Sequence, residues 1–334
     1  MRNVGFSLAI LLATAGVLRA EPLDFHYVAA DAKWVAHVDF DAVRTSTVAQ
    51  AGYRQCLDLH KEAIQQRLAK IAEQWKIDPT KDLLDLTFYG TQIKRDSGVL
   101  IVHAKVDQQL LLSKVRELPG HVATPYGRYE LHTWVPGKVG MHHHPVTGVF
   151  YRPQVLVFAA TPAEAKAALD VLDGKTPSLA GKPSPLAAEI PAGAMILARA
   201  IGLSGAELPS KSPLVKQSES FSVVLGESKG ESFFDGTVMV KSKDVAEKIK
   251  SVIEGVRSLA ALQHGADAEA MKLVDALKVS ATNKTVTVRW RAPAAQVCSQ
   301  VQKAWKRWAE KRSEAKPDGK KSLSESREQG SAEK

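Results

Sequence analysis

The sequence has 334 residues, of which 45% are hydrophobic, 24% are charged and 6% are aromatic. This composition is that of a globular protein and excludes a wholly disordered chain, a collagen and a coiled-coil rod. Two cysteines exclude a disulfide-dense scaffold and a zinc or iron–sulfur site built from several cysteines. The length predicts about two domains at roughly 150 residues each.

Residues 1–20 have the layout of a secretory signal peptide. Arg2 precedes an uncharged, mostly apolar run from Val4 to Leu18, and Ala20 offers a small residue for cleavage. The run is short for a membrane helix, and no later run reaches that length. We therefore expect a secreted or periplasmic protein cleaved after Ala20, with an uncleaved signal anchor as the alternative.

The first half of the mature chain, residues 21–175, predicts an α+β unit with a long inserted helix. Alternating apolar residues over 34–40 predict a strand. Asp41 is placed to cap the next helix, whose apolar residues from Leu57 to Trp75 recur every three or four positions and predict one buried face. The next predicted elements are strands over 84–91 and 99–106, a helix over 108–118 capped by Asp107, strands over 129–135 and 149–160, and a helix over 163–172.

Residues 176–191 are rich in Pro, Gly and Ser and predict a linker. A second α+β unit follows over 192–312, and the polar residues 313–334 predict a disordered basic tail. The elements predicted in this unit are strands over 194–201, 221–226 and 236–240, a helix from 244, strands over 277–281 and 285–290, and a last helix over about 294–311.

The two units resemble each other in sequence as well as in element order. The segment 98–107 resembles 236–244, and the strand over 155–158 with its following helix start resembles 286–289 and its helix start. We predict an α+β fold of two related units of largely antiparallel sheet with helices packed on one face. The units form either two related domains or one pseudo-symmetric pair that shares a continuous sheet.

This layout resembles that of uncharacterised secreted proteins of bacteria such as planctomycetes. The resemblance rests on the signal peptide, on the start Ala29-Ala30-Asp31-Ala32-Lys33-Trp34 that leads into the first strand, and on the order of strands and helices. It covers most of the mature chain and contains no specific motif. It implies a duplicated α+β unit and an exported protein, and no activity.

Three consecutive histidines, His142, His143 and His144, lie in a predicted loop between two strands. Imidazole is a good ligand for Zn, Cu and Ni, and His132 on the preceding strand, or His121 before it, is placed to supply a further ligand. The alternative is an exposed polar loop with incidental metal affinity, because neighbouring side chains in an extended segment point to opposite sides.

The last helix carries Val297, Val301, Trp305 and Trp308 on one face, with basic residues around it. Such a helix is suited to peripheral contact with anionic lipid. Packing of its tryptophan stripe on the sheet of the second unit is favoured over that role. Because much of the positive charge belongs to the signal peptide and the C-terminal end, a nucleic-acid partner is disfavoured.

Cys56 and Cys298 lie on predicted helices, one in each unit. In an oxidising compartment they either form one disulfide between the units or remain two buried thiols.

The chain contains no catalytic motif for a serine hydrolase, a P-loop enzyme or a dinucleotide-dependent enzyme. We therefore favour a non-enzymatic role, in binding or interaction with an envelope or extracellular partner, and predict no catalytic residue and no cofactor. The alternatives are a metal binder that uses His142, His143, His144 and His132, with Zn, Cu or Ni, and an enzyme with an unrecognised site.

Overall fold

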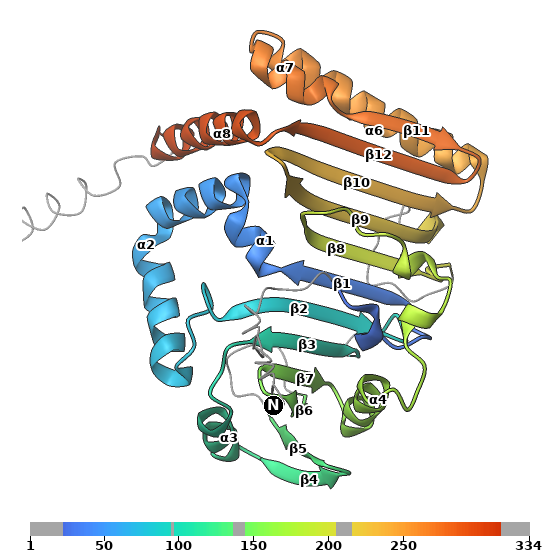
Figure 1. Ribbon diagram of the computed structural model, residues 1–334. Helices are drawn as coiled ribbons and strands as arrows, with labels where there is room; N and C mark the ends of the chain where they lie inside the picture. Colours follow the sequence, from blue (N-terminus) through green and yellow to red (C-terminus); the bar gives the residue numbers. More distant parts are fainter. Residues whose placement is uncertain (1–22, 95–96, 136–143, 205–215, 315–334) are drawn as a thin grey trace, which may run out of the picture.

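The computed structural model describes residues 23–94, 97–135, 144–204 and 216–314. In these ranges the strands form one sheet of 12 strands, in the order β11-β12-β10-β9-β8-β1-β2-β3-β7-β6-β5-β4 (Figure 1), and the neighbouring strands are antiparallel. The strands are β1 Trp34–Asp39, β2 Leu83–Gly90, β3 Val99–Ala104, β4 Val122–Tyr126, β5 Tyr129–Trp134, β6 Val146–Arg152, β7 Val155–Ala159, β8 Ala194–Ile201, β9 Ser218–Ser228, β10 Glu231–Val240, β11 Lys278–Thr282 and β12 Thr285–Pro293.

Helices at the ends and on the faces of this sheet complete an α+β fold, as the sequence predicts. They are α1 Phe40–Thr45, α2 Thr47–Trp75, α3 Gln108–Arg116, α4 Pro162–Leu172, α6 Lys243–His264, α7 Ala268–Asp275 and α8 Ala294–Glu314, with short 3-10 turns η1 Phe25–Tyr27, η2 Leu179–Gly181 and η3 Pro185–Ala187. No helix in the described ranges combines the length and the apolar character that crossing a bilayer requires.

The two halves of the chain meet at β1 and β8, which lie side by side in the middle of the sheet (Figure 1). They pair antiparallel from Trp34 opposite Ala200 to Val38 opposite Ile196. From this junction the strand order runs outward as β1-β2-β3-β7 on one side and as β8-β9-β10-β12 on the other. The order is thus mirrored about the junction, and the two halves share one continuous sheet.

The larger hydrophobic core lies on the side of the sheet that α4 covers, here called the α4 face. Alternate residues of a strand point to opposite faces, and on this face Val35, Ile101, Val157 and Leu197 are almost fully buried. Leu169 of α4 packs into the same core. The alternation of buried and half-buried residues in these strands follows from this cover.

The segment predicted as a linker belongs to this core. Leu179 and Leu186 are completely or almost completely buried in it. Arg199 of β8 is also buried, and its guanidinium donates hydrogen bonds to the carbonyl oxygens of Leu186, Ala188 and Glu189. Backbone oxygens therefore satisfy this side chain, and they tie the segment to the sheet.

The opposite side of the sheet, here called the α3 face, carries α3 at one end and α6 at the other. α6 buries Ala246 and Ile249 in a smaller core that includes Val288 of β12. Following directly opposed residues from strand to strand leads from Val288 to Leu100 of β3, so both helices are on the same side. The sequence predicts that all helices pack on one face of the sheet. This is correct for α3 and α6, which share a face, and wrong for α4, which packs on the other.

The helix predicted after the first strand is two helices, and its cap is shifted. The side chain of Asp39, not Asp41, accepts the hydrogen bond from the backbone N–H of Ala42 that caps α1. Ser46 then caps α2. The apolar row of α2 is half-buried to exposed between residues 61 and 75, because α2 runs beside the strand ends and contacts mainly α8 and α1 (Figure 1). The prediction of one buried face is therefore wrong for this half of the helix.

The last helix also differs from the sequence prediction. α8 packs chiefly on α2, and Val297 is buried near its start, whereas Trp308 near its end is 45% exposed and stacks on Trp305. The tryptophan stripe is thus not a sheet-packed core.

Cys298 is buried and Cys56 is exposed, and both thiols are free. Neither expectation for the cysteines is met in full: no disulfide joins them, and only one is buried.

The structure contains two strands more than the sequence predicts in the first half: the predicted strand over 149–160 is two strands, and β4 is additional. The segment over 149–160 is a hairpin of β6 and β7, in which Gln154 adopts a left-handed conformation with φ of 69° directly after Pro153. β4 pairs with β5 and extends the sheet to its edge. α7 is an additional short helix, whose N-terminus is capped by Asp267.

Candidate apolar ligand site

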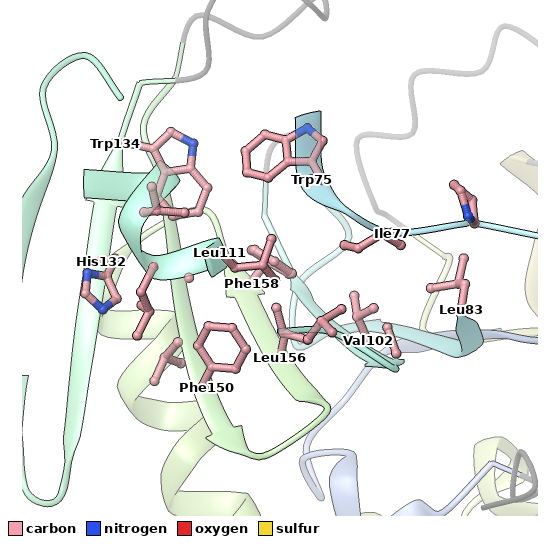
Figure 2. A pocket seen from close by; sticks show the side chains of 17 residues that line it. Trp75, Ile77, Leu83, Val102, Leu111, His132, Trp134, Phe150, Leu156 and Phe158 are labelled. Carbon is pink, nitrogen blue, oxygen red and sulfur yellow. The ribbon is translucent and has the colours of Figure 1, made fainter. Parts of the chain in front are cut away.

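A cavity of about 320 Å³ lies on the α3 face, between α3, the end of α2 and strands β2, β3, β5, β6 and β7 (Figure 2). All but one of its lining residues are apolar or glycine, and the exception is His132. The lining consists of Trp75, Ile77, Pro79, Leu83, Val102, Ala104, Val106, Leu111, Leu112, Val115, His132, Trp134, Gly148, Val149, Phe150, Leu156 and Phe158.

α3 forms one wall because its apolar residues fall on one side of the helix. The side chain of Asp107 accepts a hydrogen bond from the N–H of Leu110 and fixes the start of α3, as predicted. Leu111 and Val115 are four positions apart and lie one turn from each other on the cavity side, with Leu112 beside them. The helix therefore roofs the sheet without filling the space beneath it.

The sheet end of the cavity depends on a glycine. A Cβ atom on Gly148 of β6 would lie 2.9 Å from the Trp134 ring and 3.1 Å from the Phe158 ring. The absent side chain lets Trp134 lie across β6 and meet Phe158 edge to face, with ring centroids 6.4 Å apart. Gly148 thus leaves room for the indole of Trp134 at the cavity wall.

The end of α2 supplies the opposite wall. α2 stops at Lys76, which adopts a left-handed conformation with φ of 53°, so the chain turns sharply between Trp75 and Ile77. Both of these side chains line the cavity (Figure 2). Trp75, which the sequence places on a buried helical face, is thus part of the cavity wall.

His132 is the polar residue of the lining, and both of its ring nitrogens have partners outside the cavity. Nδ1 lies 3.0 Å from Nε2 of His121, and Nε2 lies 3.4 Å from a carboxylate oxygen of Glu130. Burial lowers the pKa of His132, although Glu130 opposes this shift. The imidazole is therefore held neutral and turned away from the cavity, whose interior presents almost no polar surface.

The structure brings only part of the predicted metal site into view. His142 and His143 lie outside the described residues, and His144 is exposed. His132 and His121 are hydrogen-bonded to each other, and in the described ranges no group of three or more His, Cys, Asp or Glu residues is arranged to hold a metal ion. Zn, Cu or Ni binding by the histidine loop remains a sequence-based hypothesis.

Two other strand histidines have polar partners on the α4 face. Nδ1 of His37 lies 2.9 Å from the hydroxyl of Thr87, and Nδ1 of His103 lies 2.7 Å from a carboxylate oxygen of Asp85. Nε2 of His37 is buried without a hydrogen-bond partner. Burial also lowers the pKa of His37, with Asp85 and Asp39 opposing it. These groups belong to the strand pairing β1–β2–β3 and do not approach the apolar cavity.

No protein-family model matches the chain, and no curated protein matches its sequence. Among solved structures, crystal form I of TP0453 aligns with a TM-score of 0.41 and 8% identity, over 86% of this chain and 100% of that chain. Crystal forms III and IV of TP0453 align with TM-scores of 0.41 and 0.40 at 7% identity, each over 84% of this chain. They cover 98% and 97% of those chains. A similarity at this level says nothing about what either protein binds.

Proposed function

We propose that this protein is an exported, non-enzymatic binding protein whose ligand inserts an apolar group, such as an acyl chain, into the cavity beneath α3. The observation that carries the proposal is a cavity of about 320 Å³ with an almost wholly apolar wall. Ligand cavities measure about 300–1,000 Å³, so this one accommodates a chain or a ring system rather than a large polar molecule.

The wall chemistry favours an apolar guest over water. A buried water needs two to four polar partners, and an apolar cavity without them binds hydrocarbon readily. About eight methylene groups at ~0.8 kcal/mol each contribute on the order of 6 kcal/mol, which corresponds to a dissociation constant of tens of micromolar. His132 offers the ligand no free nitrogen, so a polar head group stays outside.

The proposal that the protein acts in the cell envelope rests on the signal-peptide pattern of residues 1–20. Amphiphiles with acyl chains are the commonest hydrophobic molecules there, which is consistent with the cavity.

Quenching of tryptophan fluorescence by a brominated fatty acid tests the proposal. Bromine quenches an indole that it touches, and both Trp75 and Trp134 line the cavity. Titration of delipidated protein with brominated dodecanoate should quench part of the emission saturably, and unlabelled dodecanoate should reverse it. Absence of saturable quenching overturns the proposal.

A matched pair of variants on α3 locates the site. Val115→Phe fills the cavity and should weaken binding at least about tenfold, since several methylene groups lose their place. Ser113→Phe adds the same ring to the exposed side of α3 and should leave binding unchanged. Equal affinity of the two variants contradicts binding in this cavity.

A further inference from the structure

The wall of the cavity continues across the sheet as two rows of apolar side chains. Val102 of β3, which lines the cavity, stands opposite Leu86, and the row continues through Val38 and Ile196 to Leu225 of β9. Directly opposed residues of antiparallel strands point to the same side. The row therefore stays on the α3 face over five strands.

A second row runs parallel to the first. It begins at Phe158, another lining residue, and passes through Leu100, Phe88, Ala36 and Ala198 to Val223. The two alanines lie at the centre, where β1 meets β8, and carry the smallest side chains of this row. Neither row contains a polar or charged residue between β3 and β9.

These rows are open to solvent where helices do not cover them. Phe88, Ile196 and Leu225 are 41%, 40% and 36% exposed, respectively. α3 packs on β5 at one end of this face, α6 packs on β10, β11 and β12 at the other, and of the central strands β2 and β8 also contact the short helix α1. In the described residues, the central strands therefore carry an apolar band that begins at the cavity.

We infer that this band, here called the sheet trough, is the continuation of the ligand site and selects amphiphiles with a long single acyl chain. The inference rests on the proposed function and deepens it. The chain enters the cavity and lies along the trough from β3 toward β9, perpendicular to the strands. Continuity of the two rows with the lining residues Val102 and Phe158 is the reason to assign the trough to the same ligand rather than to another protein.

The dimensions set how far such a chain extends from the cavity. Four strand spacings from β3 to β9 at about 4.8 Å give a path of roughly 19 Å. One leaflet of a bilayer, half of a hydrocarbon core about 30 Å thick, is spanned by one acyl chain over about 15 Å. A long chain whose first half fills the cavity therefore extends over about two strand spacings of the trough, and a short chain stays in the cavity.

Binding of octanoate and hexadecanoate, measured by calorimetry on delipidated protein, tests this assignment. A fully buried methylene strengthens binding about fourfold, and one that lies on a half-open surface roughly twofold. Hexadecanoate should therefore bind at least about tenfold tighter than octanoate. Double replacement of Leu86 and Phe88 of β2, the strand beside β3, by Gln should remove most of that difference and leave octanoate unchanged.

Two controls separate the trough from the cavity. Met239→Gln alters a side chain that is 38% exposed on the other face of the neighbouring strand β10, and should change neither affinity. Val115→Phe should weaken both ligands.

The outcomes are distinguishable. If neither ligand binds, the proposed function fails. If octanoate binds and responds to Val115→Phe but the double variant leaves hexadecanoate affinity intact, the trough assignment is overturned. It is also overturned if sedimentation shows a dimer that the double variant dissociates, because the band is then covered by a second copy.

Discussion

Glu227 of β9 links the second half of the chain to the start of α2, and its removal should destabilise the protein measurably. Its carboxylate accepts hydrogen bonds from the Ser46 hydroxyl at 2.7 Å and from the backbone N–H groups of Thr47 at 3.0 Å and Val48 at 3.2 Å. Burial alone raises the pKa of Glu227, but these hydrogen bonds outweigh it and lower the pKa. The negative charge also faces the positive end of the α2 dipole.

The expected loss follows from these contacts. Hydrogen bonds to a charged group contribute about 1.5–3 kcal/mol, and a helix cap about 0.5–2 kcal/mol. Because Glu227 is only partly buried and solvent screens its charge, we expect Glu227→Ala to cost about 2 kcal/mol. Glu227→Gln keeps the shape but loses the charge and one acceptor oxygen, and should cost about half as much. At about 2 °C per kcal/mol the melting temperature of Glu227→Ala falls by about 4 °C.

Urea denaturation followed by circular dichroism measures both variants. Glu231→Gln, at an exposed glutamate of the neighbouring strand, is the control and should change stability little. The contribution of Glu227 should be present above the ordinary glutamate pKa of about 4.3 and be lost as the pH falls below it. If Glu227→Ala and Glu231→Gln are equally stable at pH 7, the reasoning about the cap is refuted.

Two further predictions concern buried basic side chains. Arg199→Met should cost about 2–4 kcal/mol, because three carbonyl oxygens lose their donor, and increased proteolysis within residues 176–191 should accompany it; an unchanged urea midpoint would falsify the role of Arg199 as a tie. Burial lowers the pKa of His37 and of His132, so stability should be full above about pH 6.5 and decline on acidification, when the unfolded chain takes up protons first. Each group contributes a slope of up to about 1.4 kcal/mol per pH unit, and urea midpoints at pH 7.5 and 5.5 that coincide contradict this expectation.

The sequence predicted those parts of the fold that depend on local patterns. The cap at Asp107 and the α+β class follow from residue type and spacing. The sequence predicts one strand for the hairpin of β6 and β7, because its turn residue, Gln154, is not a glycine; Pro153 is the sequence signal for the turn. The sequence predicts a buried apolar row on α2 that the structure leaves half-exposed, because helical periodicity shows an apolar face and not what covers it.

The cavity itself was beyond sequence reasoning. Its walls come from the end of α2, from α3 and from strands β2, β3, β5, β6 and β7, and residues such as Leu111, Val102 and Phe158 are typical of any core. Only packing shows that they surround a space instead of filling it. The sequence predicts His132 as a metal ligand together with His142, His143 and His144, whereas the structure places His132 at the cavity edge, hydrogen-bonded to His121.

The pairing of β1 with β8 has a consequence for how the chain reaches its native state. The hydrogen bonds of this pair join two segments about 160 residues apart. Without the other half, β1 or β8 is therefore an unpaired edge strand, although both lie in the middle of the complete sheet. Ribosomal synthesis delivers β1 long before β8, and during this interval the first half carries an open edge prone to association with other chains. Because β8 belongs to the same polypeptide, it reaches this edge at a high local concentration and closes it once it is synthesised.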